Sequence, residues 1–273
     1  MIGSVLAATL DVPGASIHYE LRGQGPLLVL HAAPMDATSF EPLAALLATR
    51  HTVLTSDPRG IHRSTVTDPD RDVTPDQRAD DLGRLLEHID RGPATVLGSS
   101  GGAISALALT QRRPDLIRTV IAHEPPLAEL LPDRDELRAA HEAMVATYLA
   151  GDRRGYWQAF LRTADIHLPN EVFEMMFAGP IEGRQAADER FFVEHMDLAT
   201  TFWTPDLEAL RTTRVRLIVG IGQDSGGQLC DRSSRALAKA LDLQPAPFPG
   251  GHIGFVDTPE IFSQRLVEVI TQD

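Results

Sequence analysis

Short apolar runs alternate with amphipathic segments along most of this chain. A continuous run such as Leu27-Leu28-Val29-Leu30 is typical of a strand buried on both faces, whereas apolar residues at helical spacing indicate a helix packed on one side. The pattern predicts strands over residues 5–10, 17–21, 27–30, 51–55, 94–97, 117–122, 215–219 and 246–248. It predicts intervening helices over residues 39–49, 76–89, 103–109, 233–241 and 259–270.

This alternation of strands and helices predicts an α/β fold, with a doubly wound, mostly parallel sheet that begins in an antiparallel hairpin. The pattern changes after residue 124, where helical spacing continues without strands for about 85 residues. Helices are expected there over residues 136–150, 154–163, 169–176 and 188–195. We therefore expect a core formed by residues 1–124 and 210–273, and an inserted helical lid formed by residues 125–209 over the carboxyl edge of the sheet.

The composition argues against nucleic-acid and membrane partners. The chain has 273 residues, of which 43% are hydrophobic, and 25 basic against 38 acidic residues give a net charge of −13. No basic run is present to bind phosphates or anionic lipid. One cysteine, Cys230, excludes an internal disulfide and is interpreted as a small hydrophobic residue. No signal peptide or spanning segment is predicted, so a cytoplasmic location is expected.

Residues 96–102, Val-Leu-Gly-Ser-Ser-Gly-Gly, stand between a predicted strand and a predicted helix. They contain Gly-x-Ser-x-Gly, the pattern of a nucleophile elbow, in which a serine occupies a sharp strand-to-helix turn. Gly98 and Gly102 suit this turn because strand and helix approach each other closely. The neighbouring Ser99 has no glycine two residues before it. Ser100 is therefore the candidate nucleophile, although the same glycines also suit a turn that serves packing alone.

The candidate general base is His252. It lies in Gly250-Gly251-His252-Ile253-Gly254, between the last predicted strand and the last predicted helix. This loop should open at the carboxyl edge of the sheet, where Ser100 is also expected. The alternative is a turn histidine that caps a helix. The remaining histidines include several on predicted strands or helices, where packing or solvation is the usual role: His18, His51, His88, His141, His167 and His195.

Two acids compete to orient His252, as the third member of a triad does. Glu124, in His123-Glu124-Pro125-Pro126, follows the strand after the elbow helix, and Asp224 lies in a glycine-rich loop after the next strand. The prolines favour Glu124 on local rigidity, whereas aspartate is common in turns for its own sake. Glu124 is preferred, with Asp224 as the alternative.

An acyl-transfer site also needs two backbone N–H groups that point at the developing oxyanion. Gly101, the residue after the candidate nucleophile, should supply one. The loop His31-Ala32-Ala33-Pro34, after the first buried strand, should supply the other, from Ala33. Small side chains there allow the backbone to approach a substrate.

With these segments the chain resembles α/β-hydrolases that carry a helical lid, over nearly its whole length. The motifs are His31-Ala-Ala-Pro34, Asp57-Pro-Arg-Gly60, Gly98-Ser-Ser-Gly-Gly102, His123-Glu-Pro-Pro126 and Pro249-Gly-Gly-His-Ile-Gly-Phe255. The family commonly has glycine where this chain has Ala32, so the oxyanion loop is expected to be slightly displaced. The family also commonly places the acid of the triad at the position of Asp224.

A subset that includes zearalenone-type lactonases instead uses a glutamate 24 residues beyond the nucleophile. Glu124 stands 24 residues after Ser100, which supports it. Dehalogenases and epoxide hydrolases of this fold carry aspartate at the elbow, so the resemblance implies neither activity here.

The leading hypothesis is a serine hydrolase that cleaves an ester or lactone of a small, largely apolar molecule through an acyl-enzyme. The alternatives are perhydrolysis of the cofactor-free haloperoxidase type, hydrolysis of a C–C bond by the same triad, and a non-catalytic small-molecule receptor. Apolar residues expected to line the pocket are Met35, Trp157, Phe160, Met175, Met176, Phe177, Phe191 and Trp203.

No cofactor is expected, because the chain has neither Gly-x-Gly-x-x-Gly nor Gly-x-x-x-x-Gly-Lys. No metal is expected either, since His123-Glu124 and His141-Glu142 lack the second histidine of a zinc helix. The oligomeric state is left open, a homodimer included.

Overall fold

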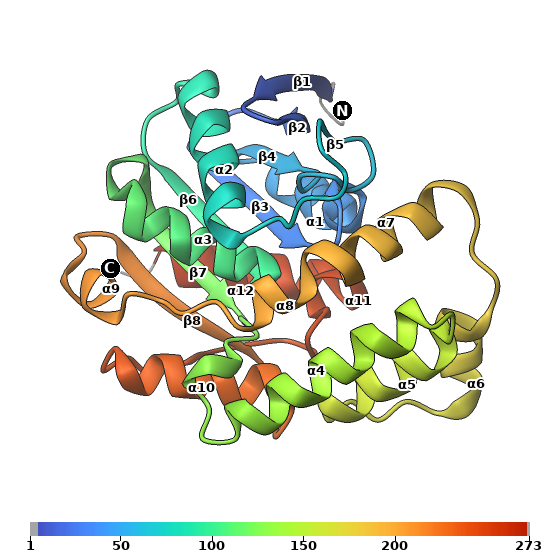
Figure 1. Cartoon of the computed structure of the whole chain (residues 1–273). Coiled ribbons are helices and arrows are strands. Elements are labelled where there is room, and N and C mark those ends of the chain that lie inside the picture. The colour runs from blue at the N-terminus through green and yellow to red at the C-terminus, as the bar shows by residue number, and fades with distance from the viewer. Residues whose placement is uncertain (1–4, 272–273) are drawn as a thin grey trace.

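The computed structural model describes residues 5–271 and is organised around a nine-stranded sheet (Figure 1). Its strands are β1 (Leu6–Val12), β2 (Ala15–Arg22), β3 (Leu27–Ala33), β4 (Thr52–Ser56), β5 (Thr65–Val66), β6 (Ala94–Ser100), β7 (Ile117–His123), β8 (Arg216–Gly222) and β9 (Ala246–Phe248). The order across the sheet is β1-β2-β4-β3-β6-β7-β8-β9, and β5 pairs with β2. Only the pairs that involve β2 are antiparallel. The prediction of a mostly parallel sheet with a leading hairpin is confirmed.

Helices cover both faces of this sheet, as the doubly wound prediction requires. The α-helices are α1 (Glu41–Leu47), α2 (Pro75–Ile89), α3 (Gly101–Arg112), α4 (Arg134–Leu149), α5 (Arg153–Thr163), α6 (Asn170–Phe173), α7 (Gly183–His195), α8 (Asp197–Thr201), α9 (Leu207–Thr212), α10 (Leu229–Ala240), α11 (Gly254–Asp257) and α12 (Pro259–Thr271). Short helical turns are η1 (Ala37–Phe40), η2 (Pro114–Leu116), η3 (Ala128–Leu130) and η4 (Glu174–Ala178), of which η4 is a π-helical turn.

The apolar run of β3 shows how its residues hold the two layers together. Leu27 and Val29 point into a core formed with α2 and α3. Leu28 and Leu30 point the other way, into a core formed with α1 and α12. All four are buried, and full burial of such a side chain contributes about 1.5–3 kcal/mol. A strand with both faces covered therefore has to be apolar at every position.

The segment predicted to be an inserted lid contains α4 to α8 and has a small apolar cluster of its own. Met144 of α4, Tyr156 of α5 and Val193 of α7 pack together in it. Figure 1 shows α4, α5 and α6 as a group set apart from the strands, with α7 and α8 returning toward α3. The boundaries at residues 125 and 209 stay a prediction.

Several short elements were not predicted. They are β5, α8, α9 and α11, and η4 continues α6 in place of the single helix expected over residues 169–176. Isolated elements this short are unstable in water and form through tertiary contacts, so the local sequence pattern does not indicate them. Within residues 5–271, no helix is long and apolar enough to cross a membrane.

The turn from β6 into α3 is tightly packed. A Cβ atom at Gly98 would collide with the carbonyl oxygen of Gly102, and one at Gly102 with the carbonyl oxygen of His31 in β3. Between these glycines, Ser100 has φ 55° and ψ −129°, a left-handed backbone that is rare outside glycine. The surrounding contacts, rather than the serine itself, therefore fix this conformation.

We expect Gly98→Ala to lower the free energy of unfolding by about 1–3 kcal/mol, because the backbone atoms that its methyl group meets cannot move aside. Urea unfolding followed by circular dichroism measures this. Gly179→Ala is the matched control: Gly179 is exposed, has φ −68° and has no atom within 4 Å of an added Cβ. It should change stability by less than about 0.5 kcal/mol. Equal stability of the two variants would contradict the packing argument.

Candidate active site

Ser100 lies at the turn from β6 into α3, is partly exposed, and lines a cavity. The adjacent Ser99 is buried, and its hydroxyl is 3.1 Å from Nδ1 of His123. Burial lowers the pKa of His123 to about 4, so this imidazole is neutral at physiological pH. Of the two serines, only Ser100 presents its hydroxyl to a cavity.

His252 lies between β9 and α11 and lines the same cavity as Ser100. Its Nδ1 is 2.6 Å from Oε2 of Glu124. The other carboxylate oxygen, Oε1, accepts a hydrogen bond of 2.8 Å from the backbone N–H of Gly222. Glu124 directly follows β7 and is fully buried, whereas the His252 side chain is 24% exposed. The hydrogen bond to Nδ1 leaves Nε2 as the nitrogen for proton transfer, and Cys230 also lies beside the ring. Within residues 5–271 no hydrogen bond joins His252 to the hydroxyl of Ser100, so the structure brings the two residues to one cavity without bonding them.

The electrostatics of this pair favour a carboxylate beside an imidazole that is easily protonated. Burial alone would raise the pKa of Glu124, but the hydrogen bond and charge of His252, together with His123 and Ser225, hold it below its usual range. Burial alone would lower the pKa of His252, but Cys230 and Glu124 outweigh it and raise the pKa. Glu124 therefore stays ionised and stabilises the charged form of His252.

Asp224, the alternative acid, is in a different position. It is exposed, and its backbone N–H donates a 3.0 Å hydrogen bond to the carbonyl of Gly250. It does not line the cavity that contains Ser100 and His252. The geometry brings Glu124 rather than Asp224 to the imidazole.

The two backbone groups predicted to hold an oxyanion lie against each other. Ala33, the last residue of β3, is in register with Ser100 of β6. A Cβ atom at Gly101 would come 2.6 Å from the carbonyl oxygen of Ala33. Both residues line the cavity. The structure thus places Ala33 and Gly101 next to each other and next to the candidate nucleophile.

The cavity has a volume of about 100 Å³ and a mixed lining. Its apolar wall includes Phe160, Ala164, Ile166, Phe192 and Leu229. Its polar residues beyond Ser100 and His252 are His141, Asp197, Thr200, Thr201, Gln228 and Cys230. The volume suits a small substrate, since pockets for drug-sized ligands measure roughly 300–1,000 Å³.

Of the predicted wall residues, Phe160 lines this cavity and the others do not, so for them a contact with substrate stays a prediction. Trp157 and Phe177 pack on each other with ring centroids 4.6 Å apart, and the indole N–H of Trp157 donates to Glu189. Met175 and Met176 are exposed on η4. Apolar lid residues are used mainly to hold the lid helices together, and helical spacing does not distinguish that role from contact with a ligand.

The remaining three predicted wall residues belong to the core of the fold. Met35 packs against the cluster of α1 and α12, and Phe191 against Ile61 and Met196. Trp203 packs beside α3. Their side chains pack between elements and do not line the cavity.

The cavity residues that the sequence analysis missed include three with ionisable side chains, Cys230, His141 and Asp197. Cys230 was interpreted as a small hydrophobic residue, but its sulfur lies within 4.8 Å of a ring nitrogen of His252 and of a Glu124 oxygen. His141 was assigned an ordinary packed or solvated role, yet it lines the cavity with Asp197. No local signal marks these residues, because only tertiary folding brings α4, α8 and α10 to the site.

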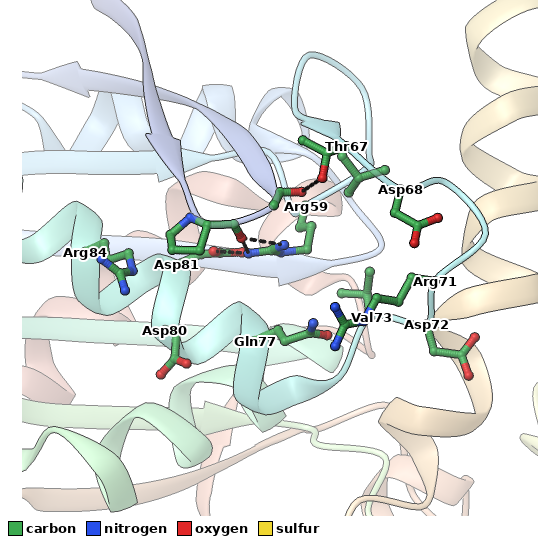
Figure 2. A pocket seen from close by; sticks show the side chains of 13 residues that line it. Arg59, Thr67, Asp68, Arg71, Asp72, Val73, Gln77, Asp80, Asp81 and Arg84 are labelled. Atoms are coloured by element: carbon green, nitrogen blue, oxygen red, sulfur yellow. Dashed lines mark hydrogen bonds and ion pairs between the residues drawn. The ribbon is translucent and has the colours of Figure 1, made fainter.

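A second cavity, of about 370 Å³, lies at the surface between α2 and the loops beside β1 and β5 (Figure 2). Arg59 and Asp81 form a two-bond ion pair in it, at 2.9 and 2.6 Å. Figure 2 shows further arginine and aspartate side chains, including Arg71 and Asp72, around this depression. None of the candidate catalytic residues lines it.

Two groups of three metal-ligating side chains lie close together within the described residues. One consists of Glu124, Cys230 and His252, in which the carboxylate and the imidazole already bond to each other. The other consists of Asp36, Asp57 and His62. The carboxylate of Asp57 accepts hydrogen bonds from the Arg63 guanidinium and from two backbone N–H groups, so its charge is balanced within the protein.

Proteins of a known fold family are similar to this chain in sequence and structure. A model of the alpha/beta hydrolase fold matches residues 25–170. Uncharacterized hydrolase YraK from Bacillus subtilis (strain 168) is 31% identical over 270 residues, which cover 97% of this chain and 96% of that protein. A zearalenone hydrolase from Bionectria ochroleuca is 25% identical over 268 residues, which cover 96% of each.

A solved structure, that of a thermophilic esterase from Thermogutta terrifontis, has a TM-score of 0.72 at 21% identity and covers 98% of both chains. At this identity the likeness concerns the fold.

We expect Glu124→Gln to lower the pKa of the His252 imidazole by about 1–3 pH units, because it removes the negative charge that favours the protonated ring. Titration of the imidazole by nuclear magnetic resonance measures this shift without any assumption about activity. Asp224→Asn is the control and should leave the His252 titration in place, since Asp224 is exposed and away from the ring. A larger shift in Asp224→Asn than in Glu124→Gln would assign the acid to Asp224.

Proposed function

The chain belongs to the alpha/beta hydrolase fold family and is a hydrolase. We propose that it cleaves a carboxylic ester or lactone of a small, largely apolar molecule through an acyl-enzyme. One observation carries the proposal. Ser100, Ala33, Gly101 and His252 line a single cavity, and His252 is bonded through Nδ1 to the buried Glu124.

In the proposed reaction, Oγ of Ser100 attacks the substrate carbonyl carbon and its proton passes to Nε2 of His252. The carbonyl oxygen becomes an oxyanion, which accepts hydrogen bonds from the backbone N–H groups of Ala33 and Gly101. The intermediate collapses, and the leaving alcohol takes the proton from His252. Water then attacks the acyl carbon with His252 again as the base, which releases the acid and restores Ser100.

Glu124 has two parts in this scheme. Its hydrogen bond to Nδ1 fixes the ring orientation, so that in the neutral ring Nε2 is the nitrogen that accepts the proton of Ser100. Its charge then stabilises the imidazolium that forms when the proton of Ser100 is transferred. The N–H of Gly222 holds the second carboxylate oxygen, so the buried charge keeps a fixed direction.

The substrate class follows from the cavity and from the relatives. A volume of about 100 Å³ and a wall that includes Phe160, Ile166 and Phe192 suit a short or compact apolar group. The relatives include a zearalenone hydrolase and an esterase, which favours an ester or a cyclic ester as the bond cleaved. We propose residues 125–209 as the lid, because α4 and α5 supply His141 and Phe160 to the wall.

We expect Ser100→Ala to lower kcat for p-nitrophenyl butyrate by about 10⁴- to 10⁶-fold, because members of a triad act as a unit. Spectrophotometric release of p-nitrophenol measures the loss. The wild-type protein should also react stoichiometrically with a fluorophosphonate, and Ser100→Ala should not. Asp224→Asn serves as the folded control and should keep most of the activity.

Other outcomes separate the alternatives. Activity retained by Ser100→Ala would exclude Ser100 as the nucleophile. A protein that binds small molecules but neither turns over the ester nor reacts with the fluorophosphonate would be a receptor on this fold. Turnover of a β-diketone or of peroxide that greatly exceeds ester hydrolysis would assign the same residues to C–C cleavage or perhydrolysis.

A further inference from the structure

A second histidine–carboxylate pair lines the cavity, on elements other than those that carry the proposed triad. His141 lies on α4 and Asp197 begins α8, whereas Ser100, Glu124 and His252 lie at the ends of core strands. Nδ1 of His141 is 3.4 Å from Oδ2 of Asp197, and both side chains are only 3% exposed. Polar groups are seldom buried to this degree unless each of their atoms has a partner.

The hydrogen bonding of this pair is incomplete on one side. Oδ1 of Asp197 lies 3.4 Å from the hydroxyl of Thr201, and Oδ2 faces Nδ1 of His141. Within residues 5–271, Nε2 of His141 is buried without a hydrogen-bond partner. Since the carboxylate can only accept, Nδ1 donates to it, and in the tautomer with its proton on Nδ1 the other nitrogen, Nε2, offers a lone pair. His141 lines the cavity, and Nε2 is the polar atom of its ring that has no partner among the described residues.

The surroundings make this acceptor selective. The ring of His141 is packed edge-to-face on Phe202, with centroids 5.4 Å apart, which fixes its orientation. Phe160, Ala164 and Ile166 supply an apolar lining in the same cavity. In such a lining, a substrate without a matching donor would leave Nε2 unpaired, and leaving a buried polar atom unpaired is costly. A site built in this way discriminates more strongly than an apolar wall does.

We propose that His141, oriented by Asp197, binds a hydroxyl group of the substrate, so that the preferred substrates are hydroxy-substituted esters or lactones. The hydroxyl donates its hydrogen bond to Nε2 while the scissile carbonyl lies at Ser100. His141 acts here as a specificity-determining residue, and Asp197 positions it. The inference rests on the proposed function and deepens it, because it names a second polar group that the substrate carries.

The experiment compares four p-nitrophenyl esters that differ at one substituent: butyrate, 2-hydroxybutyrate, 3-hydroxybutyrate and 3-methoxybutyrate. For the wild-type protein, kcat/KM for at least one hydroxy ester should exceed that for butyrate and for the methoxy ester by about tenfold, the typical worth of one net hydrogen bond. In His141→Leu this ratio should fall to about one. In Asp197→Leu, which is similar in size but has no acceptor, the ratio should also fall, because Nδ1 of the ring loses its partner.

Phe160→Leu is the matched control, because Phe160 lines the same cavity but has no hydrogen-bonding group. It should change kcat/KM for all four esters by a similar factor and keep the ratio. A wild-type protein that prefers neither hydroxy ester, or a His141→Leu variant that keeps the wild-type ratio, would overturn the proposal.

A binding measurement separates this inference from the proposed chemistry. Ser100→Ala, titrated calorimetrically with ethyl 3-hydroxybutyrate and ethyl 2-hydroxybutyrate, should bind at least one of them about tenfold more tightly than ethyl butyrate. Ser100→Ala/His141→Leu should lose that difference. If the wild-type protein hydrolyses none of the esters but this binding difference remains, the proposed function fails and the hydroxyl site stands. If hydrolysis occurs with no binding difference, the hydroxyl site fails and the proposed function stands.

Discussion

The close approach of β3, β6 and the start of α3 is the constraint on which the candidate site depends. Gly98 and Gly102 allow backbone to meet backbone where any Cβ atom would collide. The chain then turns through a left-handed residue, Ser100, and places its hydroxyl at the N-terminus of α3. The same contact brings the end of β3, with Ala33, beside Gly101. The candidate nucleophile and the two backbone groups of Ala33 and Gly101 thus lie together because of this close packing.

A buried arginine ties this turn to the helices that close the cavity. Nε of Arg78 donates to the hydroxyl of Ser105, which in turn donates to the carbonyl of Gly101 in the turn. Nη2 of Arg78 donates to the hydroxyl of Thr200 on α8. Burial lowers the pKa of Arg78 to about 10, so it stays charged at neutral pH. Its hydrogen bonds therefore carry the strength of a charged donor, and they connect the elbow to the helix that bears Asp197.

The sequence indicated the core better than the cavity, for a physical reason. Buried parallel strands must be apolar on both faces, so runs such as residues 27–30 are distinctive, and the glycines around Ser100 are required by backbone contact. The residues that line the cavity have no comparable sequence pattern. Trp157 and Phe160 both lie on α5, but Phe160 lines the cavity while Trp157 packs on Phe177. Only the tertiary arrangement of the lid decides between these roles.

The same reasoning explains why buried polar residues were hard to interpret. His141 is one of several histidines on predicted helices, and its partner Asp197 lies on a five-residue helix that local pattern does not indicate. Cys230 precedes a helix turn whose apolar spacing fits a structural role equally well. Each becomes notable only when the fold brings it beside a group from a distant segment, at separations of 56 residues for His141 and Asp197 and 128 for Glu124 and His252.

The geometry around Glu124 shows why an acid after β7 can reach the imidazole. β7 and β8 are neighbours, with His123 in register with Gly220, so a residue just past β7 lies beside the end of β8. The backbone N–H of Glu124 donates to the carbonyl of Gly220, and its Oε1 accepts from the N–H of Gly222. The glutamate is thus held across the end of β8, from where its long side chain extends to the loop that carries His252. An acid that follows β8 itself is directed by the Gly222–Gly250 contact into the exposed loop, as Asp224 is.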